Sequence, residues 1–128
     1  MKLLVDSHAF LWAITEDDRM SIEARRLFAD PNNDLWLSAA SLWEIVIKAS
    51  LGKLPLPPPI DAYIRRHLLE NSVQVLPVYS SHVFELAALP LHHRDPFDRM
   101  LVAQSRVESM PILSADPLLR AYPVEILW

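Results

Sequence analysis

The chain opens with Lys2-Leu-Leu-Val-Asp6-Ser-His-Ala-Phe-Leu-Trp12, in which a short apolar run meets one acid and then a stretch of helical periodicity. We expect a strand over Lys2–Val5 and a helix over Ser7–Thr15. The carboxyl ends of the strands in an open parallel sheet border the ligand crevice, so Asp6 is a candidate functional residue. A structural role competes with this interpretation, because an aspartate at this point also suits the N-cap of the helix.

The same alternation of short apolar runs and helical segments continues along the chain. Strands are expected at Lys2–Val5, Leu35–Leu37, Val73–Pro77, Pro111–Leu113 and Val124–Leu127. Helices are expected at Ser7–Thr15, Ser21–Asp30, Ala39–Leu51, Ile60–Asn71, Ser80–Leu89 and Pro96–Ser109, with a short helical turn after Asp116. Strands separated by helices favour crossover connections and a parallel sheet, so the sequence predicts a layered α/β fold.

Composition limits the classes of protein that this sequence can represent. The 128 residues are 52% hydrophobic, enough for one domain over residues 1–128 with a full core. The absence of cysteine excludes disulfides and thiolate metal sites. No apolar run is long enough for a secretory leader or a membrane span, so we expect a soluble cytoplasmic protein with no membrane partner.

The formal net charge of −4 argues against a protein that binds nucleic acid through phosphate contacts alone. A nucleic-acid substrate would require divalent cations or a local basic patch. Short basic clusters are found at Arg25-Arg26, Arg65-Arg66-His67 and His92-His93-Arg94. Each is better interpreted as part of a solvated surface, and the charge also permits an acidic domain without any nucleic-acid role.

Glu44 lies inside the predicted helix Ala39–Leu51, whose other residues are mostly apolar. Ser41, Glu44 and Lys48 share one narrow polar stripe because their spacings are three and four. A capping box with Ser41 or an ion pair with Lys48 would explain the glutamate structurally. However, a helix that is apolar nearly all round is buried, and a buried glutamate needs a partner such as a metal. We therefore include Glu44 among the candidate metal ligands.

The segment Asp95-Pro-Phe-Asp98 is expected to open the last long helix. Pro96 suits the first helical position, which makes Asp95 the N-cap and Asp98 the third helical residue. A favourable interaction with the helix dipole would explain Asp98 without any function. Two acids exceed what one cap requires, so we take Asp98 as functional and Asp95 as its capping or supporting neighbour.

Ser114-Ala-Asp116-Pro117 follows the apolar run Met110–Leu113. Asp116 therefore also stands at the carboxyl end of a predicted strand, although a cap before a first-turn proline explains it equally well. Carboxylates gathered at one end of a parallel sheet suit hard cations such as Mg²⁺ and Mn²⁺.

Taken in order, four phrases of the chain resemble the PIN-domain nucleases, and among them the VapC-type toxins of toxin–antitoxin pairs. The phrases are Leu3-Leu-Val-Asp6-Ser-His-Ala-Phe-Leu-Trp12, Ser41-Leu-Trp-Glu44-Ile-Val-Ile-Lys-Ala-Ser-Leu-Gly-Lys-Leu54, His93-Arg-Asp-Pro-Phe-Asp98-Arg-Met-Leu-Val-Ala-Gln104 and Ile112-Leu-Ser-Ala-Asp116. The resemblance implies a three-layer α/β/α sandwich with a central parallel sheet of four to five strands. It also implies that Asp6, Glu44, Asp98 and Asp116 bind the metal, with Ser114 in a catalytic role beside them.

By the same resemblance, the chain would be a Mg²⁺-dependent endoribonuclease, with Mn²⁺ as a possible substitute. Its RNA products would carry a 5′-phosphate and a 3′-hydroxyl, and Ser7 and Ser114 would hydrogen-bond an attacking water or a phosphate oxygen. The toxin role would bring a cognate antitoxin that inserts a basic side chain into the acidic pocket, and a homodimer. A housekeeping PIN-type nuclease and a non-catalytic PIN-like binding module are the alternatives.

Two unrelated classes of similar length fit the sequence less well. A phosphoacceptor signalling domain needs an acidic pair after the first strand and an aspartate after the third, but Asp6 has no acidic neighbour and Val73–Tyr79 contains no aspartate. A phosphatase of the Asp-x-Asp type needs a second aspartate where His8 stands.

The remaining aromatic and histidine side chains suggest structural roles. Trp12, Trp36, Trp43 and Phe97 fall on apolar faces and are expected in the core rather than as stacking platforms for bases. His8 is expected to pack or cap, and His92 and His93 to be exposed.

Overall fold

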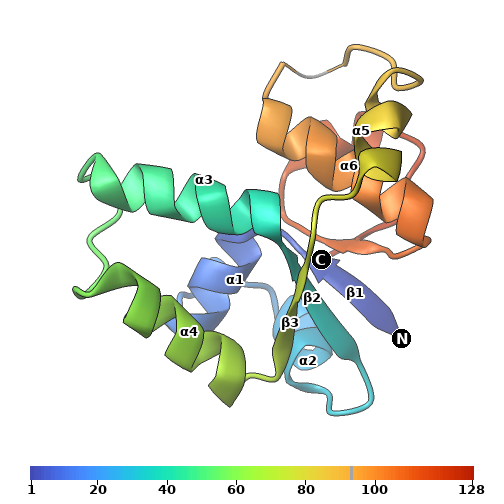
Figure 1. Ribbon diagram of the computed structural model, residues 1–128. Helices are drawn as coiled ribbons and strands as arrows, with labels where there is room; N and C mark the ends of the chain where they lie inside the picture. The colour runs from blue at the N-terminus through green and yellow to red at the C-terminus, as the bar shows by residue number, and fades with distance from the viewer. Residues whose placement is uncertain (93) are drawn as a thin grey trace.

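Five parallel strands form the centre of the computed structural model, which describes residues 1–92 and 94–128 (Figure 1). The strands are β1 (Lys2–Val5), β2 (Asp34–Ser38), β3 (Val73–Leu76), β4 (Ile112–Leu113) and β5 (Ile126–Leu127). The helices are α1 (Ser7–Ile14), α2 (Ile22–Ala29), α3 (Ala39–Ser50), α4 (Ile60–Glu70), α5 (Ser80–Leu86) and α6 (Pro96–Glu108), with a 3₁₀ turn, η1, at Pro117–Ala121. The predicted order of strands and helices is confirmed.

The strand order β3-β2-β1-β4-β5 places β1 in the middle of the sheet. Leu4 of β1 pairs with Trp36 of β2 on one side and with Ile112 of β4 on the other. Because the chain builds the sheet outward from β1 in both directions, the crossover direction changes at this strand. The crevice beside such a change is where open α/β sheets bind their ligands.

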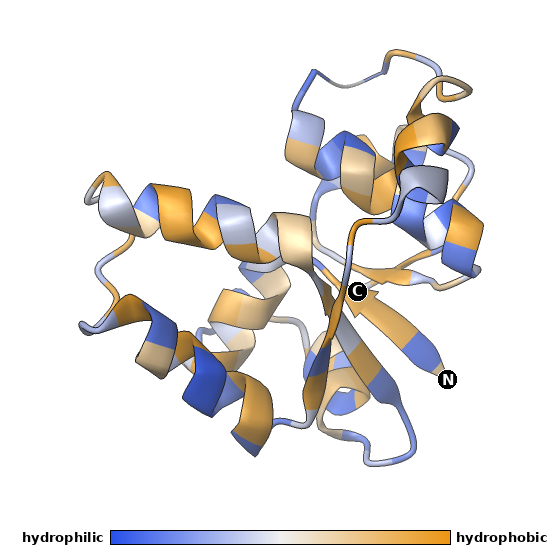
Figure 2. Ribbon diagram, in the orientation of Figure 1, coloured by the Kyte–Doolittle hydropathy of each residue, from blue (hydrophilic) through white to orange (hydrophobic). Residues whose placement is uncertain are grey.

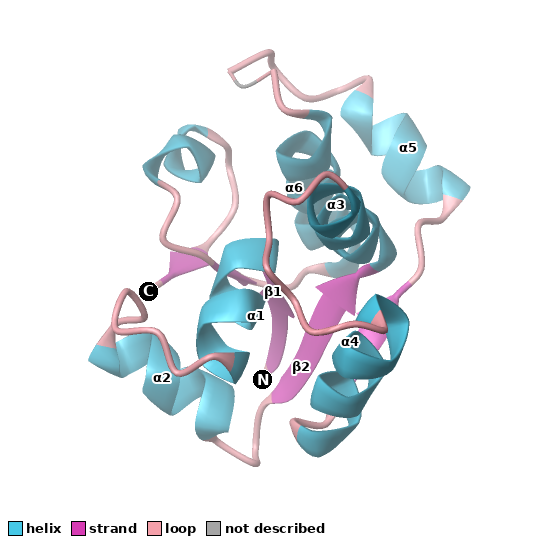
Figure 3. Ribbon diagram, turned by 90° about the vertical axis from the view of Figure 1, so that its left-hand side faces the viewer, coloured by secondary structure: helices cyan, strands magenta, loops and turns pink. Residues whose placement is uncertain are grey.

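Two apolar cores lie on opposite faces of the sheet. One contains Leu3 and Val5 with buried side chains from α1, α2, α3 and α4, and the other contains Leu4 and Ile112 with side chains from α6 and η1. Figure 3 shows α1, α2 and α4 in front of the sheet, while Figure 2 shows the apolar residues concentrated in the strands and along one side of α4. The three-layer α/β/α architecture is therefore confirmed.

Several predicted boundaries are wrong by one to three residues, with local causes. Strand β4 is shorter than predicted because Pro111 has no N–H to donate to the ladder. The carbonyl of Pro111 still accepts from the N–H of Leu4 at 2.9 Å. The final strand begins only at Ile126, since the backbone of Val124 turns back to Tyr122. α5 ends at Leu86 rather than Leu89. The chain forms turns between Leu86 and Pro90, because a proline disfavours helical geometry in the residue that precedes it.

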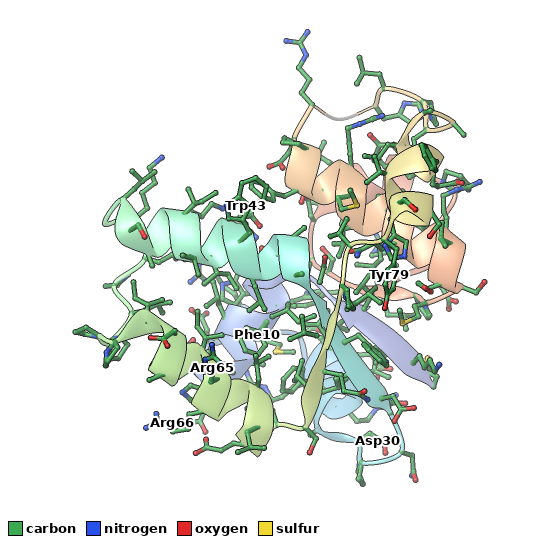
Figure 4. All side chains as sticks on the ribbon, viewed as in Figure 1. Phe10, Asp30, Trp43, Arg65, Arg66 and Tyr79 are labelled. Carbon is green, nitrogen blue, oxygen red and sulfur yellow. The ribbon has the colours of Figure 1, made fainter. Side chains whose placement is uncertain are left out.

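Helix α3 differs most from its predicted role. Its N-cap is Ser38, whose hydroxyl accepts from the N–H of Ala40, so the capping box between Ser41 and Glu44, one of the two structural alternatives for Glu44, does not form. The inward side of α3 carries the buried Ser41, Glu44 and Ile45. Trp43 is 63% exposed and projects from α3 (Figure 4), so its predicted place in the core is also wrong. Helix α3 thus buries two polar side chains beside Ile45 while exposing the apolar Trp43 and Val46.

Within the part of the chain that the structure describes, no helix is both long and apolar enough to cross a membrane.

Candidate metal-binding active site

Asp6 stands at the carboxyl end of β1, the central strand. It is the N-cap of α1, and its Oδ1 accepts from the N–H of Ala9 at 2.6 Å. Its side chain is only 7% exposed and also accepts a hydrogen bond from the Ser114 hydroxyl. Asp6 therefore fulfils the capping role and lies at the predicted site, so the two interpretations of this residue are compatible.

Burial raises the pKa of Asp6 above its ordinary value of 3.8. The hydrogen bonds from Ser114 and Ala9 and the nearby His8 lower this pKa, whereas the negative charge of Asp116 raises it. The net direction is upward because desolvation is the largest of these effects. A carboxylate in this environment is stabilised by any cation that comes close to it.

Ser114 connects Asp6 with Asp116. It follows β4, which pairs with β1, and its side chain is fully buried. Its hydroxyl donates to Asp6 and its oxygen accepts the N–H of Asp116 at 3.0 Å. Asp116 in turn caps η1, accepting the N–H of Leu118 at 2.9 Å. Because β1 and β4 are adjacent, two acids 110 positions apart in sequence number share one edge of the sheet.

Glu44 belongs to α3 and lies beside the same edge of the sheet. It is 7% exposed, and its Oε1 accepts the Ser7 hydroxyl at 2.7 Å. Its Oε2 lies 3.3 Å from Nζ of Lys48, so the predicted i,i+4 ion pair is confirmed. Since Ser7 directly follows Asp6, this hydrogen bond fixes Glu44 next to the first acid.

Asp98 lies in the first turn of α6, as predicted, with Asp95 as the N-cap and Pro96 at the first position. Oδ1 of Asp95 accepts from the N–H groups of Phe97 at 2.8 Å and Asp98 at 3.3 Å. The rings of Phe97 and Trp43 meet edge to face with centroids 5.4 Å apart. This aromatic contact joins α6 to α3 at the residues that precede Asp98 and Glu44.

The donor set has the chemistry that a hard divalent cation prefers. It consists of carboxylate oxygens with hydroxyls beside them, and it contains no sulfur or imidazole. Among residues 1–92 and 94–128, no three acidic or histidine side chains converge closely enough to form a finished metal site. Instead, each side chain is oriented by a neighbour, namely Asp6 by Ala9 and Ser114, Glu44 by Ser7 and Lys48, and Asp116 by Leu118.

A cleft of about 260 Å³ opens beside Asp6 and Asp116, and its other wall is made by His8, Trp12 and Arg19. The sequence reasoning missed this wall. His8 is exposed, so its predicted packing role is wrong, whereas Trp12 is half-buried and packs against the core, so its predicted place is confirmed in part. The missed signal was Arg19, which follows Asp17 at a spacing suited to a local ion pair across a turn.

Among the residues that the structure describes, none from the basic clusters lines this cleft. Arg65 and Arg66 project from α4 (Figure 4), where Asp61 and Glu70 lie 3.8 Å from their respective guanidinium nitrogens. Arg26 is paired with Glu23 at 2.5 Å. These pairs support the interpretation of a solvated surface. His92 is exposed, as predicted, and His93 lies outside the described residues.

Known proteins with similar sequence or structure fit this arrangement. Ribonuclease VapC16 of Mycobacterium tuberculosis is 40% identical over 60 residues, which are 47% of this chain. The match spans 43% of that relative, less than half of its length.

Three solved structures have the same fold at low sequence identity. VapBC2 from Rickettsia felis, bound to a DNA fragment from its promoter, has a TM-score of 0.75 at 13% identity, covering 99% of this chain and 98% of that one. VapBC-1 from nontypeable Haemophilus influenzae has a TM-score of 0.68 at 16% identity, covering 99% of this chain and 97% of that one. A toxin–antitoxin complex from Klebsiella pneumoniae has a TM-score of 0.64 at 12% identity, covering 98% of this chain and 96% of that one.

The family itself is identified by a match that runs almost from end to end. Residues 3–125 match the PIN domain, a segment that contains β2, β3 and β4, all but the first residue of β1, and all four candidate acids. The predicted family is confirmed, and the chain belongs to the PIN-domain family.

Proposed function

We propose that this chain is an endoribonuclease that uses Mg²⁺, or Mn²⁺ in its place, to hydrolyse RNA phosphodiester bonds. The observation that carries the proposal is the hydrogen-bonded series Asp6–Ser114–Asp116 at the carboxyl end of the central strand, open to a cleft. The family match and the similarity to a protein named as a ribonuclease support it.

Each side chain has a part that follows from its contacts. Asp6, Glu44, Asp98 and Asp116 would hold the cation directly or through water. When bound, such a cation lowers the pKa of its water toward neutrality and offsets charge on the scissile phosphate. Ser7 and Ser114 orient the carboxylates of Glu44 and Asp6, because their hydroxyls already donate to these groups. A hydrogen bond from these hydroxyls to the attacking water or to a phosphate oxygen would be their secondary role.

We further propose that the chain acts as the toxin of a toxin–antitoxin pair, with a cognate antitoxin and a second copy of itself as partners. An apolar groove of about 540 Å³ lies between α3 and α6, with Trp43, Phe97 and Met100 in its lining. Exposed apolar surface of this kind is typical of protein interfaces. A basic antitoxin side chain would complement the acids beside it, and the net charge of −4 favours a basic partner.

The decisive experiment incubates purified protein with total RNA and Mg²⁺ or Mn²⁺, beside samples containing EDTA. We expect cleavage only with the metal, and products with 5′-phosphate ends. Asp6→Asn and Asp98→Asn should each abolish cleavage while the far-UV circular dichroism remains that of the wild type. Cleavage that persists in EDTA, or in both variants, would overturn the four-carboxylate proposal.

A second experiment separates a toxin from a housekeeping nuclease. Expression of the wild type is expected to arrest growth, whereas expression of Asp6→Asn is not. Growth that is equal for the two proteins at matched expression levels would argue for the housekeeping or binding alternatives.

A further inference from the structure

Arg19 lies over the ring of Trp12 in the wall of the candidate active-site cleft. Its guanidinium carbon is 4.8 Å from the centroid of the Trp12 ring. Trp12 also contacts His8 at 5.8 Å and Trp128 at 5.7 Å between ring centroids. We call His8, Trp12 and Arg19 the stacking wall, because all three line the cleft that Asp6 and Asp116 close on its other side.

The guanidinium of Arg19 is held in place by Asp17. Nε and Nη2 donate to the two carboxylate oxygens at 3.0 and 2.7 Å, and the backbone N–H of Arg19 donates to the same carboxylate at 2.9 Å. The Arg19 side chain nevertheless remains 68% exposed. Because the guanidinium is already fixed, binding a ligand on it costs the Arg19 side chain little further conformational freedom.

The pairing also decides which ligand chemistry this wall suits. Asp17 offsets most of the positive charge of Arg19, and the acids across the cleft repel phosphate, so a phosphate gains little there. The face of the guanidinium that does not cover Trp12 stays available, since the Arg19 side chain is largely exposed. Flat guanidinium and aromatic surfaces stack with unpaired nucleobases, as in single-stranded RNA recognition.

We propose that the stacking wall binds one unpaired nucleobase of the RNA substrate, next to the nucleotide whose phosphate is cleaved. This inference rests on the proposed ribonuclease function. A base on His8, Trp12 and Arg19 directs its ribose and phosphate toward Asp6 and Asp116 on the facing wall. The wall is thus a positioning site that selects single-stranded substrate, and the acids carry the chemistry.

The test compares Arg19→Gln with Arg26→Gln. Both arginines are exposed and paired with a nearby carboxylate, so both changes remove the same charge, but Arg26 does not line the cleft. In cleavage of a short single-stranded RNA with Mg²⁺, Arg19→Gln should raise KM by about 5- to 150-fold, the range for loss of one stacked base, with kcat changed less. Arg26→Gln should match the wild type. Arg19→Lys, which keeps the charge but loses the plane, should resemble Arg19→Gln.

Three further measurements distinguish stacking from phosphate binding and from loss of structure. Binding of fluorescent RNA to the Asp6→Asn protein should weaken when Arg19→Gln is added, while the dependence of affinity on salt concentration keeps its slope. An RNA lacking one base near the cut should bind the wild type as weakly as intact RNA binds Arg19→Gln. Equal urea midpoints for Arg19→Gln and Arg26→Gln would exclude unfolding as the cause.

The outcomes separate the two proposals. If the wild type cleaves RNA and Arg19→Gln behaves as Arg26→Gln does, the stacking wall is overturned and the ribonuclease proposal stands. A salt slope reduced by about one in Arg19→Gln would replace stacking with a phosphate contact. If the wild type neither binds nor cleaves RNA, both proposals fail.

Discussion

The Ser7 hydroxyl donates a 2.7 Å hydrogen bond to Glu44 Oε1 and so ties the start of α1 to the middle of α3. Both side chains are buried, so neither loses this partner to water without cost.

Ser7→Ala should destabilise the fold by about 1–3 kcal/mol, because it leaves a buried carboxylate oxygen without its donor. It should also reduce RNA cleavage, since Glu44 is then free to leave its position. Urea unfolding and cleavage assays measure the two effects. Ser7→Thr keeps the hydroxyl and is the matched control. If Ser7→Ala and Ser7→Thr are equally stable, the hydrogen bond contributes nothing to the fold.

Asp6→Asn should be more stable than the wild type at neutral pH. The folded-state pKa of Asp6 is raised by burial, so its contribution to stability is full below pH 3.8 and is lost as pH rises through the raised pKa. Asparagine has no charge to desolvate and caps a helix about as well as aspartate. Urea midpoints compared at neutral pH and below pH 3.8 should show the gain only at the higher pH. A gain that is the same at both would contradict the assignment.

Asp17→Asn should have the opposite pH dependence. The hydrogen bonds from Arg19 lower the pKa of Asp17 to about 2, so this carboxylate stabilises the fold above pH 3.8 and the contribution fades as pH falls toward 2. The variant should therefore be less stable than the wild type at neutral pH and approach it in acid. Thermal unfolding across this range measures the difference, and a constant difference would exclude the ion pair as its source.

Divalent cations should raise the Tm of the wild type, because a ligand that binds only the folded protein stabilises it by about 2.7 kcal/mol at one hundred times its Kd. The effect should be lost in EDTA and weakened by Asp116→Asn, since Asp116 faces the same cleft as Asp6. NaCl at equal ionic strength provides the control for screening. An equal rise in Tm with NaCl would show that no specific cation site exists.

Lys48→Met should tighten Mg²⁺ binding, because Nζ of Lys48 lies 3.3 Å from Glu44 Oε2 and competes with a cation for this oxygen. An ion pair at this degree of exposure contributes about 0.2–1 kcal/mol, so the cation midpoint should fall by a factor of roughly 1.4 to 5. Lys53→Met removes the same charge from an exposed lysine beyond the helix and should leave the midpoint unchanged. A shift shared by both variants would indicate a general effect of net charge.

The sequence predicted the order of the elements well because apolar periodicity is a local property, visible around β1 and α6 alike. The positions of Asp6 and Asp116 were also predictable, since the carboxyl ends of parallel strands meet at one edge. The orientation of α3 was not. Its apolar residues suggested burial all round, but Trp43 faces solvent, and only the packing of α3 against its neighbours determines this.

The stacking wall of His8, Trp12 and Arg19 could not be predicted from the sequence for a similar reason. Trp12 appears as a core residue in the periodicity of α1, and it does pack against the core in part. Its contact with Arg19 depends on the turn between α1 and α2, where Asp17 fixes the arginine. Side chains that a loop brings to a site leave no periodic signal.

The placement of β4 between β1 and β5 also governs when the cleft can come into existence during translation. Asp6 leaves the ribosome well ahead of its neighbours Ser114 and Asp116, which follow it by 108 and 110 positions. Until they emerge, β1 has β2 beside it and an open edge where β4 belongs. An emerging chain has therefore made all of α1 to α6 before Asp6 and Asp116 can meet, so assembly of the cleft follows that of the helical layers.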